Sequence, residues 1–268
     1  MFTFRRITLL FFILLFVMNF VRYIGCRYDW FSGHFCTNTY IYIIILFALY
    51  IGISVGMSFV IQSGYHYKAL CSVKTTRKIC SLTFDDGPQE SQTQAILEIL
   101  QREKLQATFF LIGEKITGNE EIVREMKKQG HLIGNHAWQH SPWFDFLPGR
   151  RMKEEIVRTA AVIQKITGES PILFRPPYGV IVPVLNRVLK RLPYHVIGWN
   201  IRSFDTIKKD PERVARRIIK KLKPGSIILL HDHLQLAPDI LESLIARLKD
   251  HNYQIIPLTN LLDIDAYA

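Results

Sequence analysis

Two adjacent carboxylates, Asp85 and Asp86, follow the largely apolar stretch 81–84, and Gly87-Pro88 then interrupts the strand that this stretch predicts. Neighbouring residues on a strand point to opposite faces, so both carboxylates can reach one site only where the strand has just ended. Two acids at such an edge suit a metal ligand beside a general base. The alternative is an Asp-Gly turn without chemistry, and ligands further along the chain decide between the two.

Histidines that could complete a metal site follow another predicted strand, at His136 and His140. Residues four apart lie on one face of a helical turn, so these two imidazoles could share a metal ion. With Asp86 as a third ligand the set suits Zn²⁺, with Co²⁺, Ni²⁺ or Mn²⁺ as alternatives, and leaves positions open for water and substrate. Without Asp86, a pair of surface or core histidines is the simpler interpretation.

Arg175 follows a further predicted strand and stands immediately before Pro176-Pro177. The two prolines fix the backbone, so the Arg175 side chain and the Tyr178 amide are predicted to be held rigidly. Arg175 is then placed to orient Asp85. The alternative is a Pro-Pro loop with a surface arginine.

His231 emerges from the apolar stretch 226–230. A histidine in this place can titrate near neutrality, as a general acid must. The nearby His233 is instead predicted to lie at a helix start or on the surface.

Short strand-like segments alternate with helical ones from Cys80 onward. This alternation predicts a parallel sheet, either doubly wound or closed into a barrel, and both architectures place ligands at the carboxyl ends of the strands. The predicted strands are Cys80–Asp85, Ala107–Ile112, His131–Asn135, Ile172–Arg175, His195–Asn200, Ser226–Leu230 and Gln254–Leu258. The predicted helices include Gln92–Lys104, opened by a Ser91…Gln94 capping pattern, Glu120–Gln129, Met152–Ile166 and Pro211–Leu222.

The front of the chain is apolar, and the stretch Ile41–Ile61 contains no charged residue. It is long enough to cross about 30 Å of hydrocarbon as a helix. The shorter stretch Ile7–Val21 suits either a first membrane span or a signal-peptide core, and we favour an uncleaved helical hairpin. The expected organisation is a membrane segment (1–65, with helices near 7–24 and 40–61), a linker (66–78) and a catalytic domain (79–268). An integral protein of a bacterial inner or plasma membrane is therefore predicted.

The chain has a formal net charge of +11, and no nucleic-acid-binding motif is present. A basic surface beside membrane lipids is the favoured interpretation, and nucleic acid is not expected as a partner. The lysines and arginines that flank the hairpin outnumber those in its connecting loop, which by a small margin favours a cytoplasmic domain and leaves the side open. The four cysteines are Cys26, Cys36, Cys71 and Cys80, and they show no CxxC spacing. The sequence leaves open whether a disulfide forms within the first pair or within the second.

Four motifs together resemble the polysaccharide deacetylases, the NodB-homology domains of carbohydrate esterase family 4. They are Thr83–Pro88, His136…His140, Arg175–Gly179 and Leu230-His231-Asp232, in the order and approximate spacing of the family. The resemblance covers roughly residues 79–260. It implies a distorted (β/α) barrel that hydrolyses the N-acetyl group of an amino sugar at a metal ion.

The resemblance also implies a role for each matching residue. Asp85 would act as the general base, with Arg175 positioning it, and His231 would protonate the leaving amine. The remaining implied roles are metal binding by Asp86, His136 and His140, oxyanion binding by the Tyr178 amide, contact with the acetyl methyl group by Leu230, and pairing of Asp205 with His231 to raise its pKa.

This sequence departs from the family at two motifs. Ala137 stands where the family usually has a serine or threonine whose hydroxyl braces the second histidine. In the family's Asp-x-x-Asp-Trp motif, Arg202 replaces the first aspartate, Asp205 keeps the second, and Thr206 replaces the tryptophan that walls the acetyl pocket. Arg202 is predicted to be a structural ion-pair partner rather than a catalytic residue. The acyl group stays open between acetyl, formyl and another small acyl group.

Two classes of function follow. The first is a membrane-anchored, metal-dependent amidohydrolase that acts on an N-acetylated glycan polymer, or on a lipid-linked (polyprenyl-phosphate) sugar as a deacylase or deformylase. The second is a catalytically inactive sugar-binding module that keeps the fold. Retention of the complete set of base, metal ligands and acid favours the enzyme, because a binding module does not need it.

Overall fold

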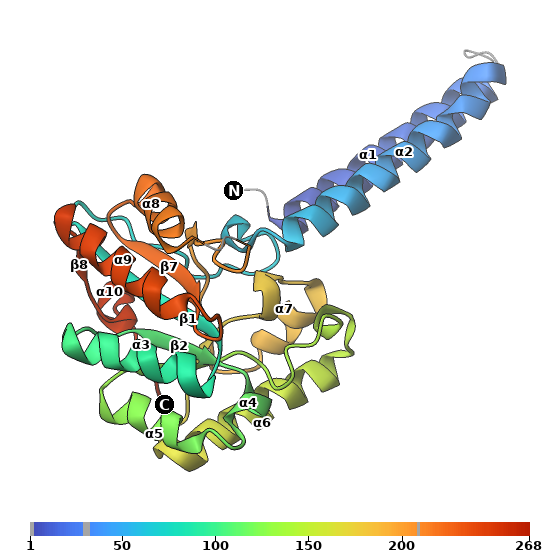
Figure 1. Cartoon of the computed structure of the whole chain (residues 1–268). Coiled ribbons are helices and arrows are strands. Elements are labelled where there is room, and N and C mark those ends of the chain that lie inside the picture. Colours follow the sequence, from blue (N-terminus) through green and yellow to red (C-terminus); the bar gives the residue numbers. More distant parts are fainter. Residues whose placement is uncertain (1–2, 29–32, 208–209) are drawn as a thin grey trace.

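A computed structural model describes residues 3–28, 33–207 and 210–268. It has two parts, a long helical hairpin and an α/β domain from which the hairpin projects (Figure 1). The hairpin consists of α1 (Phe4–Arg27) and α2 (Gly33–Ser58). Both helices are long and apolar enough to cross a membrane, and few of their described residues are buried. The predicted hairpin is thus present, with a longer first helix than the sequence pattern indicated.

The domain is built around one curled, parallel sheet. The strand order is β5-β4-β3-β2-β1-β7-β6, and β8 pairs with the beginning of β1. Central strand β1 is almost completely buried, as expected for a parallel strand that is covered on both faces. The strands are β1 (Ile79–Gly87), β2 (Thr108–Leu111), β3 (Leu132–Asn135), β4 (Leu173–Phe174), β5 (His195–Val196), β6 (Ile201–Arg202), β7 (Ser226–His231) and β8 (Gln254–Ile255).

Helices surround the sheet and bury its outer face, so the predicted distorted (β/α) barrel is confirmed (Figure 1). One cluster of buried apolar side chains, the outer core, joins this face to α3, α5, α8 and α9. A second cluster, the inner core, lies on the opposite face and includes residues of α7 and α10. The helices are α3 (Glu90–Arg102), α4 (Gly113–Ile116), α5 (Glu120–Lys128), α6 (Gly149–Thr167), α7 (Pro183–Leu189), α8 (Pro211–Lys221), α9 (Ala237–Asp250) and α10 (Leu258–Leu262).

The segment 66–78, expected to be a linker, is tied to the sheet. Leu70 forms a parallel bridge with Ile197, and Ser72 forms an antiparallel bridge with Ser226. These bridges connect the β5 side of the sheet with β7, across the gap between the two ends of the strand order. The hairpin is joined to the same region, because the Ile181 amide donates to the Ser58 carbonyl and Ile61 is buried in the inner core.

Two local expectations change in the structure. Helix α3 begins at Glu90 with Gln89 as its N-cap, so Ser91 lies inside the helix and the predicted capping pattern is wrong. Cys71 and Cys80 are free thiols, whereas Cys26 is disulfide-bonded. The side chain of Cys36, whose pairing with Cys26 the sequence left open, lies outside the described residues.

Candidate active site

The two carboxylates of β1 reach the same site because the strand bulges between them. Asp85 pairs with Phe110 and Gly87 with Leu111, so Asp86 is an extra residue without a partner on β2. Its φ of 74° lies in the left-handed region, which is unusual for a residue other than glycine. The bulge cancels the alternation of a regular strand, and both carboxylates therefore point to the carboxyl edge of the sheet.

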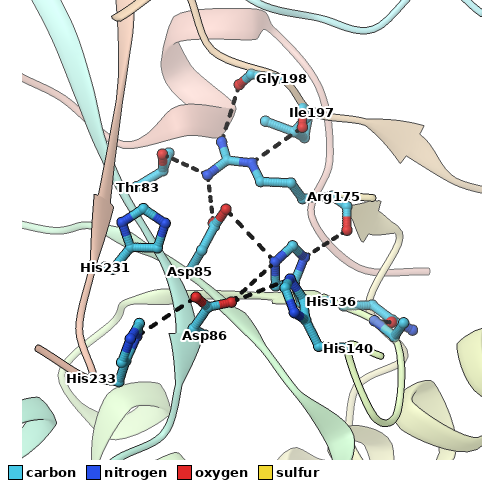
Figure 2. A network of polar contacts seen from close by, with 12 residues as sticks. Thr83, Asp85, Asp86, His136, His140, Arg175, Ile197, Gly198, His231 and His233 are labelled. Carbon is cyan, nitrogen blue, oxygen red and sulfur yellow. Dashed lines mark hydrogen bonds and ion pairs between the residues drawn. The ribbon is translucent and has the colours of Figure 1, made fainter. Parts of the chain in front are cut away.

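The two predicted histidine ligands meet Asp86, but they do so from a loop and not from a helical turn. His136 and His140 follow β3 in irregular backbone, and His140 has a φ of 52°. Their Nε2 atoms lie 3.5 and 3.4 Å from the same Asp86 oxygen, Oδ1 (Figure 2). The two histidines are therefore close together as predicted, but the predicted helical turn is absent.

These three side chains fit a divalent cation. The Asp86 Oδ1 atom is buried and has no hydrogen-bond partner among the described residues, and all three ligand atoms lie within 4.8 Å of one another. The Nδ1 atom of His136 lies 2.7 Å from the Arg175 carbonyl oxygen, to which it can donate, and this contact leaves Nε2 with its lone pair directed at the site. Two imidazoles and a carboxylate are ligands that Zn²⁺ accepts.

The charges around the two histidines also favour a bound cation. Burial alone lowers the pKa of His136, but the nearby Asp85 and Asp86 carboxylates raise it above its ordinary value. For His140, burial and the neighbouring His136 lower the pKa to about 4. His140 is therefore a neutral imidazole at pH 7, which is the form that binds a metal, and the site carries negative charge that a cation can balance.

The loop that carries His140 is braced by a carboxylate on α6. The Glu155 Oε2 atom accepts hydrogen bonds from the backbone N–H groups of Trp138 and Gln139, at 3.0 and 2.8 Å. The Tyr178 hydroxyl adds a hydrogen bond to the His140 carbonyl oxygen, at 3.1 Å. These contacts hold the loop although Ala137 has no hydroxyl.

Replacing Glu155 by alanine is expected to weaken Zn²⁺ binding by about 10–100-fold, because such supporting contacts fix the orientation of a ligand. The neighbouring Glu154→Ala is the matched control, since Glu154 is exposed and pairs with Arg150 and Arg151 instead of the loop. Competition with a chromophoric chelator measures the affinity of each variant. Equal affinities of the two variants would show that the brace does not support the metal site.

Arg175 is buried beneath the site and binds Asp85, as predicted. Its Nη1 atom donates to Asp85 Oδ1 at 2.6 Å and to Thr83 Oγ1 at 2.9 Å. Nε and Nη2 donate to the carbonyl oxygens of Ile197 and Gly198 (Figure 2). The guanidinium thus fixes one oxygen of Asp85, while the other oxygen, Oδ2, lies 3.8 Å from His136 Nε2 and faces the metal ligands.

His231 lies at the end of β7 and pairs with Asp205, as predicted. The His231 Nδ1 atom is 2.8 Å from Asp205 Oδ1, and the His231 backbone N–H donates to Asp205 Oδ2 at 2.9 Å. Burial lowers the pKa of the imidazole, but the hydrogen bond and charge of Asp205, with smaller contributions from Asp85 and Asp86, raise it to about 9. His231 is therefore protonated at pH 7, as a proton donor must be.

Replacing Asp205 by asparagine is expected to move the alkaline limb of the rate profile to a pH roughly 1–3 lower, since the opposite charge that raises the pKa of His231 is removed. The sign follows from the role: a general acid acts when protonated, so the rate falls as the pH rises through its pKa. In the wild type that fall is expected near pH 9. Measuring kcat from pH 5 to 10 checks the shift, and coincident alkaline limbs would show that His231 is not the acid.

Known proteins match this chain over the same domain. A family model described as polysaccharide deacetylase matches residues 72–197. A peptidoglycan-N-acetylglucosamine deacetylase of Bacillus cereus is 30% identical over 195 residues, which cover 71% of this chain and 91% of that protein. The chain belongs to the polysaccharide deacetylase family. Within it, the peptidoglycan-N-acetylmuramic acid deacetylase PdaC of Bacillus subtilis is 32% identical over 193 residues, 72% of this chain and 40% of PdaC.

Solved structures of polysaccharide deacetylases share the fold. PdaC has a TM-score of 0.66 at 31% identity and is covered to 93%, with 71% of this chain. A pseudoenzyme of carbohydrate esterase family 4 from Bacillus anthracis has a TM-score of 0.68 at 25% identity, and the match covers 73% of this chain and 69% of that one. The family fold therefore occurs both in proteins called deacetylases and in one called a pseudoenzyme.

In the present protein, a pocket of about 230 Å³ opens beside the carboxylates and histidines of the site. Leu229, and not Leu230, lines it, so the prediction for Leu230 is wrong. Leu230 is one residue away on the strand and points to the outer core, where it is buried. Trp199, which the sequence analysis did not select, forms another wall and packs closely against Gly179, where a Cβ atom would lie 2.3 Å from the indole.

Two other side chains lie differently from expectation. His233 is in the site, with Nδ1 3.6 Å from Asp86 Oδ2, although it was predicted to be peripheral. Arg202 lines the pocket and forms no ion pair among the described residues, so its predicted structural pairing is wrong. Tyr178 has a φ of 57° within the turn Pro177–Gly179 and lines the pocket with Gly179.

Proposed function

We propose that this protein is a metal-dependent deacetylase that hydrolyses the N-acetyl group of an amino sugar in a cell-wall polysaccharide. The observation that carries the proposal is the convergence of a buried, unpartnered carboxylate oxygen of Asp86 with two imidazoles, between Asp85 and a protonated His231. The two relatives named above are peptidoglycan deacetylases, which supports the same substrate class.

Asp86, His136 and His140 would hold the cation, with Zn²⁺ as the expected ion. A cation there supplies Lewis-acid chemistry, because it lowers the pKa of water and polarises an amide carbonyl group. Asp85, held by Arg175, accepts a proton from the attacking water as the oxygen–carbon bond forms. The amide N–H of Tyr178 donates to the carbonyl oxygen as it gains negative charge.

His231 completes the reaction at the leaving nitrogen. It donates its proton to the nitrogen as the carbon–nitrogen bond breaks, so the products are acetate and the free amine of the sugar. Asp205 keeps the imidazole oriented and charged before the transfer. Leu229 and Trp199 form apolar walls beside the reacting groups, which suits a small acyl group.

The experiment is metal-dependent acyl release by the full-length protein in detergent. The protein is stripped with a chelator, reloaded with Zn²⁺ and assayed for acetate release from chitooligosaccharides and peptidoglycan fragments. Release that requires Zn²⁺ is the expected result. If the protein binds Zn²⁺ and releases acetate from none of these glycans, the polysaccharide deacetylase is overturned in favour of a lipid-linked or non-acetyl substrate. If the protein binds no Zn²⁺, the competing function, an inactive sugar-binding protein, takes its place.

We infer further that the hairpin anchors the domain in a membrane. The support is the apolar, uncovered surface of α1 and α2 along their described length. Full-length protein is expected to stay in the membrane pellet after alkaline carbonate extraction. Release of the intact chain into the supernatant would contradict the anchor.

A further inference from the structure

The wall of the active-site pocket contains a cation that the proposed chemistry does not use, Arg202. Its direction is fixed by the sheet. In the β6–β7 pair Arg202 stands opposite Leu229, and Ile201 stands opposite Ile228. Paired residues of parallel strands point to the same face, and Leu229 lines the pocket while Ile228 is buried in the outer core. The backbone register therefore directs the Arg202 side chain to the pocket side of the sheet.

The protein offers this guanidinium no anion. Among the described residues no carboxylate oxygen lies within 4.0 Å of it, and its one ring contact is with Phe204, at 5.2 Å. The acids near the pocket face other groups: Asp85 accepts from Arg175, Asp205 pairs with His231, and Asp86 faces the three histidines His136, His140 and His233. Arg202 is exposed, and its place in the argument comes from its position in the pocket wall beside the carboxylates and histidines.

The neighbouring Thr206 lines the pocket as well. Its hydroxyl group can donate or accept a hydrogen bond. The wall formed by Arg202 and Thr206 is thus polar. It suits a charged substituent better than an apolar one.

We propose that Arg202 binds an anionic group, a carboxylate or a phosphate, carried by the sugar whose N-acyl group is removed. The inference rests on the proposed deacetylase function and narrows its substrate class to negatively charged amino sugars. A guanidinium stays charged at all physiological pH values, and its planar fork matches both anions with two hydrogen bonds. The net charge of +11 would also favour the approach of such substrates.

The test compares three substrates that differ in charge, using Zn²⁺-loaded, full-length wild type and Arg202→Gln in detergent. The neutral substrate is diacetylchitobiose. The carboxylate substrate is the disaccharide of N-acetylglucosamine and N-acetylmuramic acid, and the phosphate substrate is diacetylchitobiose 1-phosphate. The measured quantity is kcat/KM for each anionic substrate divided by kcat/KM for the neutral one.

The ratio for at least one anionic substrate is expected to fall roughly 10–100-fold in Arg202→Gln, the range for losing hydrogen bonds to a charged group. The loss should appear mainly in KM, because the anion is bound equally before and during the reaction. Arg202→Lys should give an intermediate ratio, since it keeps the charge without the fork. Arg216→Gln, which removes an exposed charge from α8, is the matched control and should leave the ratio within about twofold.

The outcomes separate this inference from the function on which it rests. If the kcat/KM ratio falls for only one of the two anionic substrates, that substrate shows whether Arg202 binds a sugar carboxylate or a sugar phosphate. Ratios that are equal in wild type and Arg202→Gln overturn the anion subsite, while the deacetylase stands on its neutral turnover. If no substrate is turned over, calorimetric Kd values for the same three glycans decide: an anion preference lost in Arg202→Gln supports the subsite, and equal preferences overturn it.

Discussion

Replacing Asp85 by asparagine is expected to lower kcat about 10²–10⁴-fold, the usual contribution of a general base, while Zn²⁺ still binds. The change removes the proton acceptor and little else. An asparagine oxygen can still accept from Arg175, and Asp85 is not one of the three ligands that meet at the cation site. Acetate release under saturating substrate and metal content by atomic absorption are measured on the same preparation.

The adjacent Asp86→Asn is the matched control for this prediction. Both changes convert one aspartate of β1 to its amide, but Asp86 supplies the oxygen that faces His136 and His140. The Asp86→Asn variant is expected to lose both metal binding and activity, whereas the Asp85→Asn variant is expected to lose activity alone. Asp85→Asn protein with no bound Zn²⁺, or with more than about a tenth of wild-type kcat, would contradict the separation of roles.

This separation could be predicted from the sequence only in part. The pattern of an apolar strand, two acids and a Gly-Pro stop placed both acids at the carboxyl end of a strand, where the structure has them. The reason that both acids serve it is the bulge at Asp86, and a bulge leaves no periodic signal in a strand that ends there. Likewise, the four-residue spacing of His136 and His140 predicted that the two side chains lie together on a helical turn. They do lie together, but on a loop.

The alternation of side chains between the two faces of a strand could have corrected the choice of Leu230 as the residue that lines the pocket. Because His231 faces the site, the residue two positions earlier, Leu229, must face it too, and Leu230 must face away. Strand β6 escaped prediction for another reason. It has two residues, too few for any period, although its register directs Arg202 towards the pocket.

Contacts between distant segments were beyond reach of the sequence alone. Glu155 lies on an amphipathic helix, where an acid is expected at the surface, and only the packing of α6 against the loop shows that it binds two backbone amides of that loop. The bridges of the segment before β1 are a second example. Leu70 pairs with Ile197 and Ser72 with Ser226, yet these single bridges are too short to leave a strand period in the sequence.

Replacing Arg175 by methionine is expected to destabilise the domain by about 3–5 kcal/mol, the cost of leaving one member of a buried ion pair alone. The side chain is completely buried and makes four hydrogen bonds, two of them to the carbonyl oxygens of Ile197 and Gly198, which have no other donor among the described residues. Burial lowers the pKa of its guanidinium, and the charge and hydrogen bond of Asp85 oppose that shift. Methionine fills a similar volume but leaves the Asp85 carboxylate and both carbonyl groups without a donor.

For a domain of this size the loss corresponds to a fall in Tm of roughly 6–20 °C, which tryptophan fluorescence of the detergent-solubilised chain can follow. The surface change Arg150→Met is the control, because Arg150 is exposed and pairs only with a neighbouring glutamate on its own helix. Its Tm should stay within about 2 °C of the wild type. Equal melting temperatures for the two variants would mean that Arg175 positions Asp85 without stabilising the barrel, since the same guanidinium would then be dispensable for folding. The expected result instead makes one buried cation responsible for both the orientation of the base and the stability of the sheet around it.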